Sequence, residues 1–403
     1  MKNTRKKNTK KHLKKTQKKK KRLHPVIKEF KNFLLTNPLE RMYITLMIEQ
    51  VPKVKKWDRF RLKNTDDLIN KLNNVLTVAP DYNETKLVGT PFSAIIFESM
   101  GTPAGLAAFR NVKINKMFKK ILKEWGKFLN SPKSRYVLNN GPNGWFSPKA
   151  MKKIHLDDYI HDNNKKYYGF KSWNDFFTRK FIKGARPIAE PNNNKIIVSP
   201  CDFTIYKIRK NVKKYNTFWI KSQPYSLMEM LNNEKYANMF TGGDVFQAFL
   251  SPFNYHRWHS PISGTIVSAK VIPGLYFSER NQQTNFKRKT VKSWIEYSED
   301  PNDQDGSEGY ITTNQTRALF YIRSPNPKIG IMAFMAIGMV EISTCIINKY
   351  IKPGYRVKKG EEIGRFQFGG SSACLIFKKG AIKKFTRKSG FCELGTEIAI
   401  ANN

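Results

Sequence analysis

The chain has 403 residues, 40% of them hydrophobic, which excludes a wholly disordered protein and suffices for one large domain or two ordinary ones. Its formal net charge of +42 favours anionic partners, such as nucleic acid, an acidic membrane surface or a phosphorylated substrate. The four cysteines are not spaced as metal ligands and no secretory signal precedes them, so we expect reduced thiols, an intracellular protein and no metal site.

Residues 1–24 are predicted to form a disordered basic tail, because 13 of the first 22 residues are Lys or Arg and none is acidic. Three functions fit such a tail. It is a nuclear-localisation or nucleic-acid-binding arm, an arm that contacts an anionic membrane, or a solvated tail that only aids solubility. The sequence leaves these interpretations open.

Residues 25–150 have a helical pattern and are predicted to form an amino-terminal helical extension. Within residues 117–130, apolar side chains recur at steps of three and four residues, as on the buried face of an amphipathic helix. They are Met117, Phe118, Ile121, Leu122, Trp125, Phe128 and Leu129. A stretch rich in Gly, Pro and Asn, residues 131–150, is predicted to be the loop that ends this region.

After Ile188 the chain changes to short β-rich runs separated by Gly, Pro and Asn turns, so residues 151–403 are predicted to form a catalytic domain. One helix interrupts it near Ser226 and Glu229, which have the spacing of a capping box. The predicted fold class is therefore α+β, with the helical region packed on a β-rich domain like a barrel or a sandwich. We expect residues 260–272 and 352–366 to lie in the same β-structure.

The longest uncharged apolar stretch, residues 329–340, is shorter than the ~20 residues of a membrane-spanning helix. We therefore expect no transmembrane segment, and a protein that is soluble or peripherally bound to a membrane.

His256 and His259 are the only histidines of the β-rich half and lie three residues apart. Two histidines at this spacing fit zinc, but no further Cys or His is placed to complete a site. A lone pair is more often structural than catalytic, so the pair alone leaves both interpretations open.

Near the carboxyl end, the sequence Gly369-Gly370-Ser371-Ser372 lies between two apolar, strand-like runs. Glycine permits the strained backbone and close approach that a hydroxyl needs to attack its own preceding peptide bond. Taken alone, such a motif is far more often an ordinary flexible hairpin. Asp202, which follows Ser-Pro-Cys, likewise fits a simple turn aspartate.

Four segments in order make a stronger pattern: FFTRKFIKGARPI, SPCD, YHRWHSPISG and GRFQFGGSS. From about Trp173 to the carboxyl end, this combination resembles the phosphatidylserine decarboxylase family. The preceding GTPAGLAAF and GWFSPKA resemble the helical extension of one branch, which includes fungal decarboxylases of free aromatic amino acids. Two departures are Phe203, where the family usually has Gly after the aspartate, and NQTRALFYI at residues 314–322, which is closer to the extended branch.

The resemblance implies a self-cleaving triad of Asp202, His259 and Ser371. In such a triad the imidazole removes the serine proton and the carboxylate stabilises the imidazolium. Cleavage between Gly370 and Ser371 leaves a β chain, residues 1–370, and an α chain, residues 371–403, which stay partners.

Ser371 becomes a pyruvoyl group, the covalent cofactor that accepts the electrons released with carbon dioxide. His256 is expected to support decarboxylation by orienting the substrate or handling a proton.

The expected reaction is the decarboxylation of phosphatidylserine to phosphatidylethanolamine, and the basic surface would favour peripheral contact with an anionic membrane. The alternative is a soluble decarboxylase of a free, aromatic amino acid. A third hypothesis is a nucleic-acid-binding protein whose basic tail carries the function while the decarboxylase core is inert.

Overall fold

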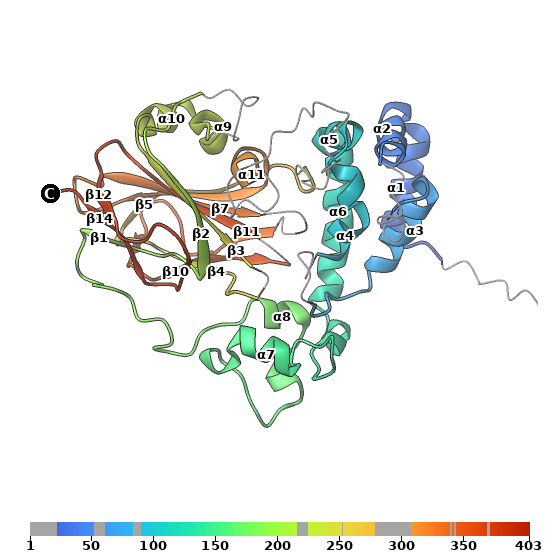
Figure 1. Cartoon of the computed structure of the whole chain (residues 1–403), viewed down its shortest axis with the longest axis horizontal. Helices are drawn as coiled ribbons and strands as arrows, with labels where there is room; N and C mark the ends of the chain where they lie inside the picture. The colour runs from blue at the N-terminus through green and yellow to red at the C-terminus, as the bar shows by residue number, and fades with distance from the viewer. Residues whose placement is uncertain are drawn as a thin grey trace, which may run out of the picture.

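The computed structural model has a layer of amino-terminal helices beside a set of antiparallel sheets, which confirms the predicted α+β class (Figure 1). The structure describes residues 22–51, 61–83, 90–215, 225–251, 253–278, 308–338, 341, 344–368 and 371–403. The predicted disordered tail lies almost wholly outside these residues, so it stays a prediction.

Six α-helices make up the first part of the described chain. They are α1 (Pro25–Thr36), α2 (Pro38–Glu49), α3 (Thr65–Val75), α4 (Pro91–Met100), α5 (Pro103–Arg110) and α6 (Val112–Leu129). Helix α6 begins where Oδ1 of Asn111 accepts hydrogen bonds from two backbone N–H groups of its first turn. All the apolar residues predicted for its inner face are buried except Phe128, which is half-buried.

Short helices connect this layer to the sheets: η2 (Pro132–Val137), α7 (Pro148–Ile154), η3 (Leu156–Asp158), η4 (Lys166–Gly169) and α8 (Trp173–Phe177). Residue 150, the predicted end of the helical extension, lies within α7. The first strand begins at Ile196. The helical layer packs on the segment that follows β5, because Phe118 of α6 contacts Phe277 with ring centroids 5.2 Å apart.

The central sheet has eight strands in the order β13-β2-β3-β11-β7-β6-β5-β9. Their bounds are β2 (Phe203–Arg209), β3 (Asp244–Leu250), β5 (Gly264–Ile272), β6 (Arg317–Arg323), β7 (Ile331–Gly338), β9 (Arg356–Val357), β11 (Ser371–Phe377) and β13 (Phe391–Cys392). All the pairings are antiparallel. Gly264 pairs with Val357, which confirms that the two segments expected in one β-structure meet there.

Two three-stranded sheets cover one face of the central sheet. One consists of β1 (Ile196–Val198), β14 (Glu397–Ala401) and β12 (Ile382–Phe385), and the other of β4 (Arg257–His259), β10 (Glu362–Gln367) and β8 (Thr344–Ile347). Three short helices cover the opposite face: α9 (Leu227–Leu231), α10 (Glu234–Phe240) and α11 (Glu308–Asn314). The sheets are open in the described part of the chain, so the domain is layered like a sandwich and is not a closed barrel.

The predicted helix after Ser226 is present as α9, but it has only five residues. The Ser226 hydroxyl donates to the Glu229 carboxylate, and no backbone N–H of the helix donates to the Ser226 side chain. The two residues therefore meet as the capping-box spacing predicts, while the cap on the backbone is missing.

No helix among the described residues is long and apolar enough to cross a membrane. All four cysteines are buried and free of disulfides.

Candidate active site

Ser371 is the first residue of β11 and lies inside the central sheet. It pairs with Leu250 of β3 on one side and with Gly338 of β7 on the other. The residue is fully buried, and its hydroxyl has no hydrogen-bond partner within the described ranges. A buried hydroxyl without a partner is costly, which marks this position for a role other than stability. Gly370, the other residue of the predicted cleavage site, lies outside the described residues.

Ser372 faces the other side of the sheet, because successive side chains of a strand alternate. Its hydroxyl donates to the Ala248 carbonyl at 2.9 Å and accepts from Nε2 of Gln247 at 3.0 Å. Ser371 instead shares a face with Ala373 and Leu375, which pack in the core beneath the two small sheets. The strand thus turns only Ser371 toward the sheet that carries the candidate histidines.

His256 lies between β3 and β4 and is fully buried. Its ring stacks on Phe177 of α8, with centroids 4.0 Å apart and ring planes 26° apart. Its backbone carbonyl accepts a hydrogen bond from the Phe366 N–H of β10 at 2.8 Å. The imidazole is therefore fixed in an apolar, aromatic environment on the same side of the central sheet as Ser371.

His259 ends β4, and both nitrogens of its ring have partners. Nδ1 lies 2.7 Å from the Gly360 carbonyl oxygen, and Nε2 lies 2.8 Å from the Tyr255 hydroxyl. Since a carbonyl only accepts, we assign the proton to Nδ1, and Nε2 then accepts from Tyr255. Burial lowers the pKa of His259, against the hydrogen bond to Gly360, which favours the charged form. The imidazole is consequently held neutral, as a base requires.

Asp202 lies directly before β2 and is 2% exposed. Arg186 binds both of its oxygens, with Nε 3.2 Å from Oδ1 and Nη2 3.0 Å from Oδ2. The Leu394 N–H donates to Oδ1 at 2.7 Å. Arg186 also binds Asp158 at 3.0 Å, so one guanidinium joins the segment before the sheets to the loop that holds Asp202.

An aromatic contact connects the Arg186–Asp202 pair to His259. The Arg186 guanidinium lies 4.4 Å from the centre of the Phe181 ring, and Phe181 packs on Tyr255 with centroids 4.2 Å apart. In addition, the His259 N–H donates to the Pro200 carbonyl at 2.8 Å. Asp202 and His259 are therefore linked through the side chains of Arg186, Phe181 and Tyr255 and through the backbone at Pro200.

No hydrogen bond between described residues joins Asp202, His259 and Ser371 to one another. The Gly360 carbonyl holds Nδ1–H of His259, which is the place that a triad carboxylate takes. The triad of Asp202, His259 and Ser371, and the role of His256, therefore stay predictions.

Sequence reasoning missed Arg186, Tyr255 and Gly360. The first two lie inside the motif segments, which could have drawn attention to them, whereas a backbone carbonyl carries no signal in the sequence.

Two further features bear on cofactors and ligands. In the part of the chain that the structure describes, no three His, Cys, Asp or Glu side chains are grouped to hold a metal ion.

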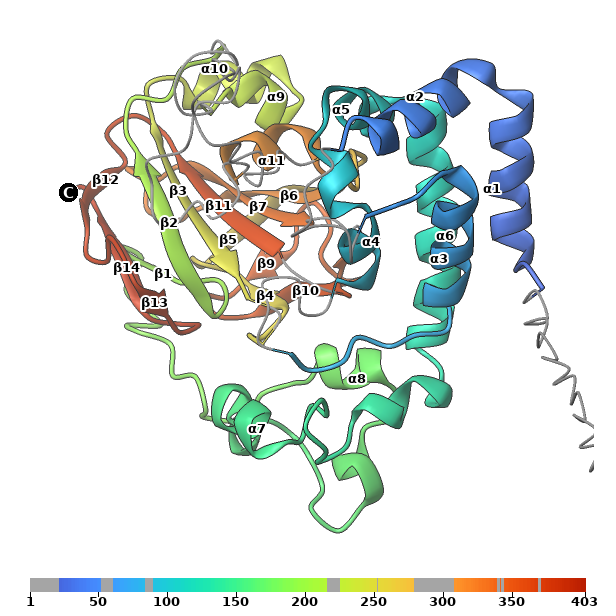
Figure 2. The same cartoon turned by 45° about the vertical axis from the view of Figure 1, so that its right-hand side comes forward.

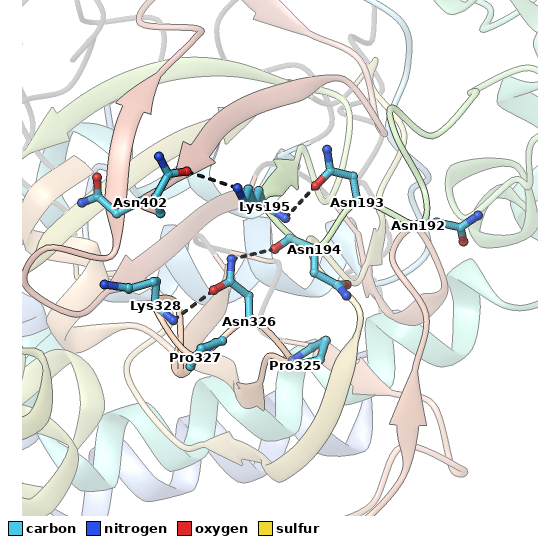
Figure 3. A pocket seen from close by; sticks show the side chains of 10 residues that line it. Asn192, Asn193, Asn194, Lys195, Pro325, Asn326, Pro327, Lys328 and Asn402 are labelled. Carbon is cyan, nitrogen blue, oxygen red and sulfur yellow. Dashed lines mark hydrogen bonds between the residues drawn. The ribbon is translucent and has the colours of Figure 1, made fainter.

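A hollow of about 480 Å³ lies beside the turn between β6 and β7 (Figure 3). It is lined by Asn192, Asn193, Asn194, Lys195, Pro325, Asn326, Pro327, Lys328, Asn402 and Asn403.

This hollow is remote from Ser371. It adjoins the start of β7, whereas Ser371 pairs with Gly338 at the end of that strand, roughly 24 Å away at the usual rise per residue. Several of its polar groups bind one another, as Asn326 does the Asn194 carbonyl at 3.3 Å (Figure 3). It is therefore not part of the candidate active site.

Comparison with known proteins identifies the family. The sequence model described as phosphatidylserine decarboxylase matches residues 173–400, which is more than half of the chain. The chain belongs to the phosphatidylserine decarboxylase family. A second model of the same description matches residues 24–154, the amino-terminal helices. The chain is thus a decarboxylase by family, and both of its parts match.

Three curated relatives cover most of the chain. Decarboxylase iboD of Amanita muscaria (strain Koide BX008) is 35% identical over 72% of this chain and 84% of its own length. The L-tryptophan decarboxylase of Psilocybe cubensis is 32% identical over 93% of this chain and 84% of its own. A phosphatidylserine decarboxylase proenzyme of Clostridium perfringens (strain SM101 / Type A) is 30% identical over 71% of this chain and 83% of its own.

Proposed function

We propose that this protein is a pyruvoyl-dependent decarboxylase that makes its cofactor from Ser371 by cutting its own Gly370–Ser371 bond. The buried Ser371 hydroxyl carries the proposal, because it lies at the first position of a central strand and has no hydrogen-bond partner among the described residues. The cofactor is a product of the serine itself, so it requires no separate binding cavity. Family membership supports the same chemistry.

The proposed cleavage begins when Nε2 of His259 takes the Ser371 proton, which requires that it exchange Tyr255 for the serine. Oγ then adds to the carbonyl carbon of Gly370, the bond from that carbon to the Ser371 nitrogen breaks, and the nitrogen takes the proton back from His259, so that the amide becomes an ester. Removal of the Ser371 α-proton eliminates the ester as the Gly370 carboxylate and leaves dehydroalanine. Water converts the dehydroalanine into the pyruvoyl group and ammonia.

In the second half of the reaction, the pyruvoyl group would supply a carbonyl that binds the substrate amine and accepts the electrons released with carbon dioxide. His256 is proposed to orient the substrate or to manage the proton that replaces the carboxyl group. Its stacking on Phe177 fixes the ring for either task.

The substrate that the comparisons support best is a free amino acid, and an aromatic one in particular. The L-tryptophan decarboxylase of Psilocybe cubensis aligns over 93% of this chain, whereas the clostridial proenzyme aligns over 71%. Phosphatidylserine is the second candidate, since both matching family models carry its name and the net charge of +42 would draw the protein to an anionic lipid surface.

The experiment that tests the proposal gives purified, processed protein each substrate in turn. One arm uses L-tryptophan and other free aromatic amino acids, and the other uses phosphatidylserine in mixed vesicles. Carbon dioxide release and the mass of the amine product are measured, with Ser371→Ala as the control. Turnover of either substrate that disappears in the control supports the proposal. A chain that stays intact and releases no carbon dioxide overturns it, and leaves binding of nucleic acid through the basic tail as the function to test.

A further inference from the structure

Phe368 directly follows β10 and has an uncommon backbone conformation. Its φ of 69° lies in the left-handed region, which a bulky residue adopts only when its surroundings enforce it. The enforcing contacts come from helix α6. The Phe368 ring packs on Trp125 with centroids 5.8 Å apart, and a Cβ added at Gly126 would lie 3.1 Å from its Cε2 atom.

Glu341 makes a second contact between the helical layer and the neighbourhood of Ser371. It lies three residues after Gly338, the partner of Ser371 on β7, and is 1% exposed. Its Oε1 accepts from the Ser93 N–H at 2.8 Å, and its Oε2 from the Ser93 hydroxyl at 3.1 Å. Ser93 lies in the first turn of α4, whose N-cap residue Thr90 makes no side-chain cap. A carboxylate of the catalytic domain therefore caps this helix.

The two contacts belong to one unit of the helical layer. Phe92 of α4 packs against Trp125 of α6 with centroids 5.1 Å apart and ring planes 72° apart. Figure 2 places α4 and α6 between the outermost helix, α1, and the sheets. The helices that contact Phe368 and Glu341 are thus the inner ones, braced from behind by the rest of the layer.

We propose that α4 and α6 position the segment that precedes Ser371 and the segment that follows its strand partner Gly338 for self-cleavage, with Trp125, Gly126 and Ser93 as positioning residues. This inference rests on the proposed cleavage at Ser371. A hydroxyl adds to a carbonyl only when the two are held about 3–3.5 Å apart and aligned, and a misplacement of about 1 Å costs roughly 100-fold in rate. The helices fix Phe368 on the chain that leads to the serine and Glu341 on the chain that leaves its neighbouring strand.

Pure packing does not account for both contacts. An apolar interface between helices and sheets requires neither a left-handed phenylalanine nor a buried carboxylate, and each of these is unfavourable when considered alone. One lies three residues before Ser371 and the other three residues after its strand partner Gly338, and both are stabilised by contacts with the helical layer.

The first test follows the rate of self-cleavage in freshly synthesised full-length chains by intact mass spectrometry. Trp125→Ala should cleave at least ~10-fold more slowly than the wild type, and Trp125→Phe, which keeps an aromatic ring against Phe368, should recover most of the rate. The matched control is Ile114→Ala, a buried residue about 16 Å away along the same helix. It should lower the melting temperature comparably and leave cleavage fast.

The second test uses α4. Ser93→Ala removes the hydroxyl bound to Glu341, and Ser99→Ala removes a buried hydroxyl of the same helix that donates to the Ile96 carbonyl at 3.0 Å. Cleavage should slow in the first variant alone. If Trp125→Ala does not fold, the comparison of Ser93→Ala with Ser99→Ala still tests the inference.

The outcomes separate the two proposals. A wild-type chain that stays uncut overturns the proposed function together with this inference. A wild type that is cut, with folded Trp125→Ala or Ser93→Ala variants cut at the wild-type rate, overturns the inference alone. Equal slowing in the test variants and their controls also overturns it, because the effect would then be general destabilisation.

Discussion

Ser371 and Ser372 are adjacent in the chain, yet they face opposite sides of the central sheet. The Ser372 hydroxyl is bound by Gln247 and by the Ala248 carbonyl, while the Ser371 hydroxyl has no partner among the described residues. A hydroxyl with two good partners contributes to stability, and a buried hydroxyl with none is available for chemistry.

We therefore expect opposite results from two alanine substitutions. Ser371→Ala should remain one chain. Ser372→Ala should still split into residues 1–370 and 371–403, but it should be less stable by roughly 1–3 kcal/mol because the hydrogen bond from Nε2 of Gln247 to Ser372 is lost. Mass spectrometry and thermal unfolding measure the two effects. If Ser372→Ala stays intact while Ser371→Ala is cut, the cleavage site lies one residue further on.

The two histidines are predicted to act in different halves of the reaction. His259→Ala should stay uncut, since no base then takes the Ser371 proton. His256→Ala should be cut and carry the pyruvoyl mass, but release carbon dioxide slowly. Cleavage is read by mass spectrometry and decarboxylation by trapping carbon dioxide. If His256→Ala stays uncut while His259→Ala is cut normally, the two histidines have the reverse of the predicted roles.

The pH dependence of self-cleavage should report the pKa of His259. Burial lowers this pKa below the usual 6.5, so the ring is neutral and competent as a base throughout the neutral range. Cleavage should be fast and nearly constant near pH 7 and should fall only as acid protonates the ring. Rates measured from about pH 5 to about pH 8 should therefore show an inflection below 6.5, and an inflection above it would mean that a different group is the base.

Asp202→Asn tests the buried ion pair with Arg186. The substitution removes one of the charges that the guanidinium faces, at 3% exposure of the Asp202 side chain, and should destabilise the fold by roughly 1–3 kcal/mol, because Asp158 still pairs with Arg186. Glu393→Gln is the control, because Glu393 is 3.7 Å from the same guanidinium and its side chain is 57% exposed, so the loss should be at most about 1 kcal/mol. Urea unfolding in an uncut Ser371→Ala background gives both values. Equal losses would contradict the importance of the buried pair.

Glu341→Gln should change how stability depends on pH. Burial raises the pKa of Glu341 to about 7, although the hydrogen bonds from Ser93 oppose the shift. Between about pH 4.5 and about pH 7 the unfolded chain releases this proton while the folded chain retains it, so stability falls as pH rises, by roughly 3 kcal/mol in all. Glutamine does not titrate, so the variant should be the more stable protein above pH 7. The free energy of unfolding of both proteins is measured across this pH range. If the difference between them stays constant, the raised pKa of Glu341 is contradicted.

The sequence predicts the local structure of this protein better than its strand order. The spacing of apolar residues identifies the buried face of α6, and the β-rich runs after Ile188 become strands. The position of β11 between β3 and β7 is not readable, because Ser371 and its partner Leu250 are far apart in the chain and many strands share the same apolar alternation. Long-range pairing depends on the whole set of strands.

The candidate site shows the same contrast between what the local sequence predicts and what depends on the whole fold. The motifs point to Ser371, and alternation along β11 then explains why it faces the histidine side and Ser372 does not. The partners of the other residues depend on the fold. Gly360 reaches His259 through its backbone, and Arg186 reaches Asp202 across a loop.

The central position of β11 has a practical consequence for handling the protein. This strand pairs with β3 and β7 along nearly its whole length, from Ser371 to Phe377 on one side and to Ile376 on the other. If the chain is cut before Ser371, main-chain hydrogen bonds on both sides still hold the small fragment in place. An affinity tag at the carboxyl end should therefore purify both fragments together in native buffer and release the large one only in denaturant. Mixing separately produced fragments should not restore the enzyme, because a central strand cannot insert into a sheet after the other strands have already assembled without it.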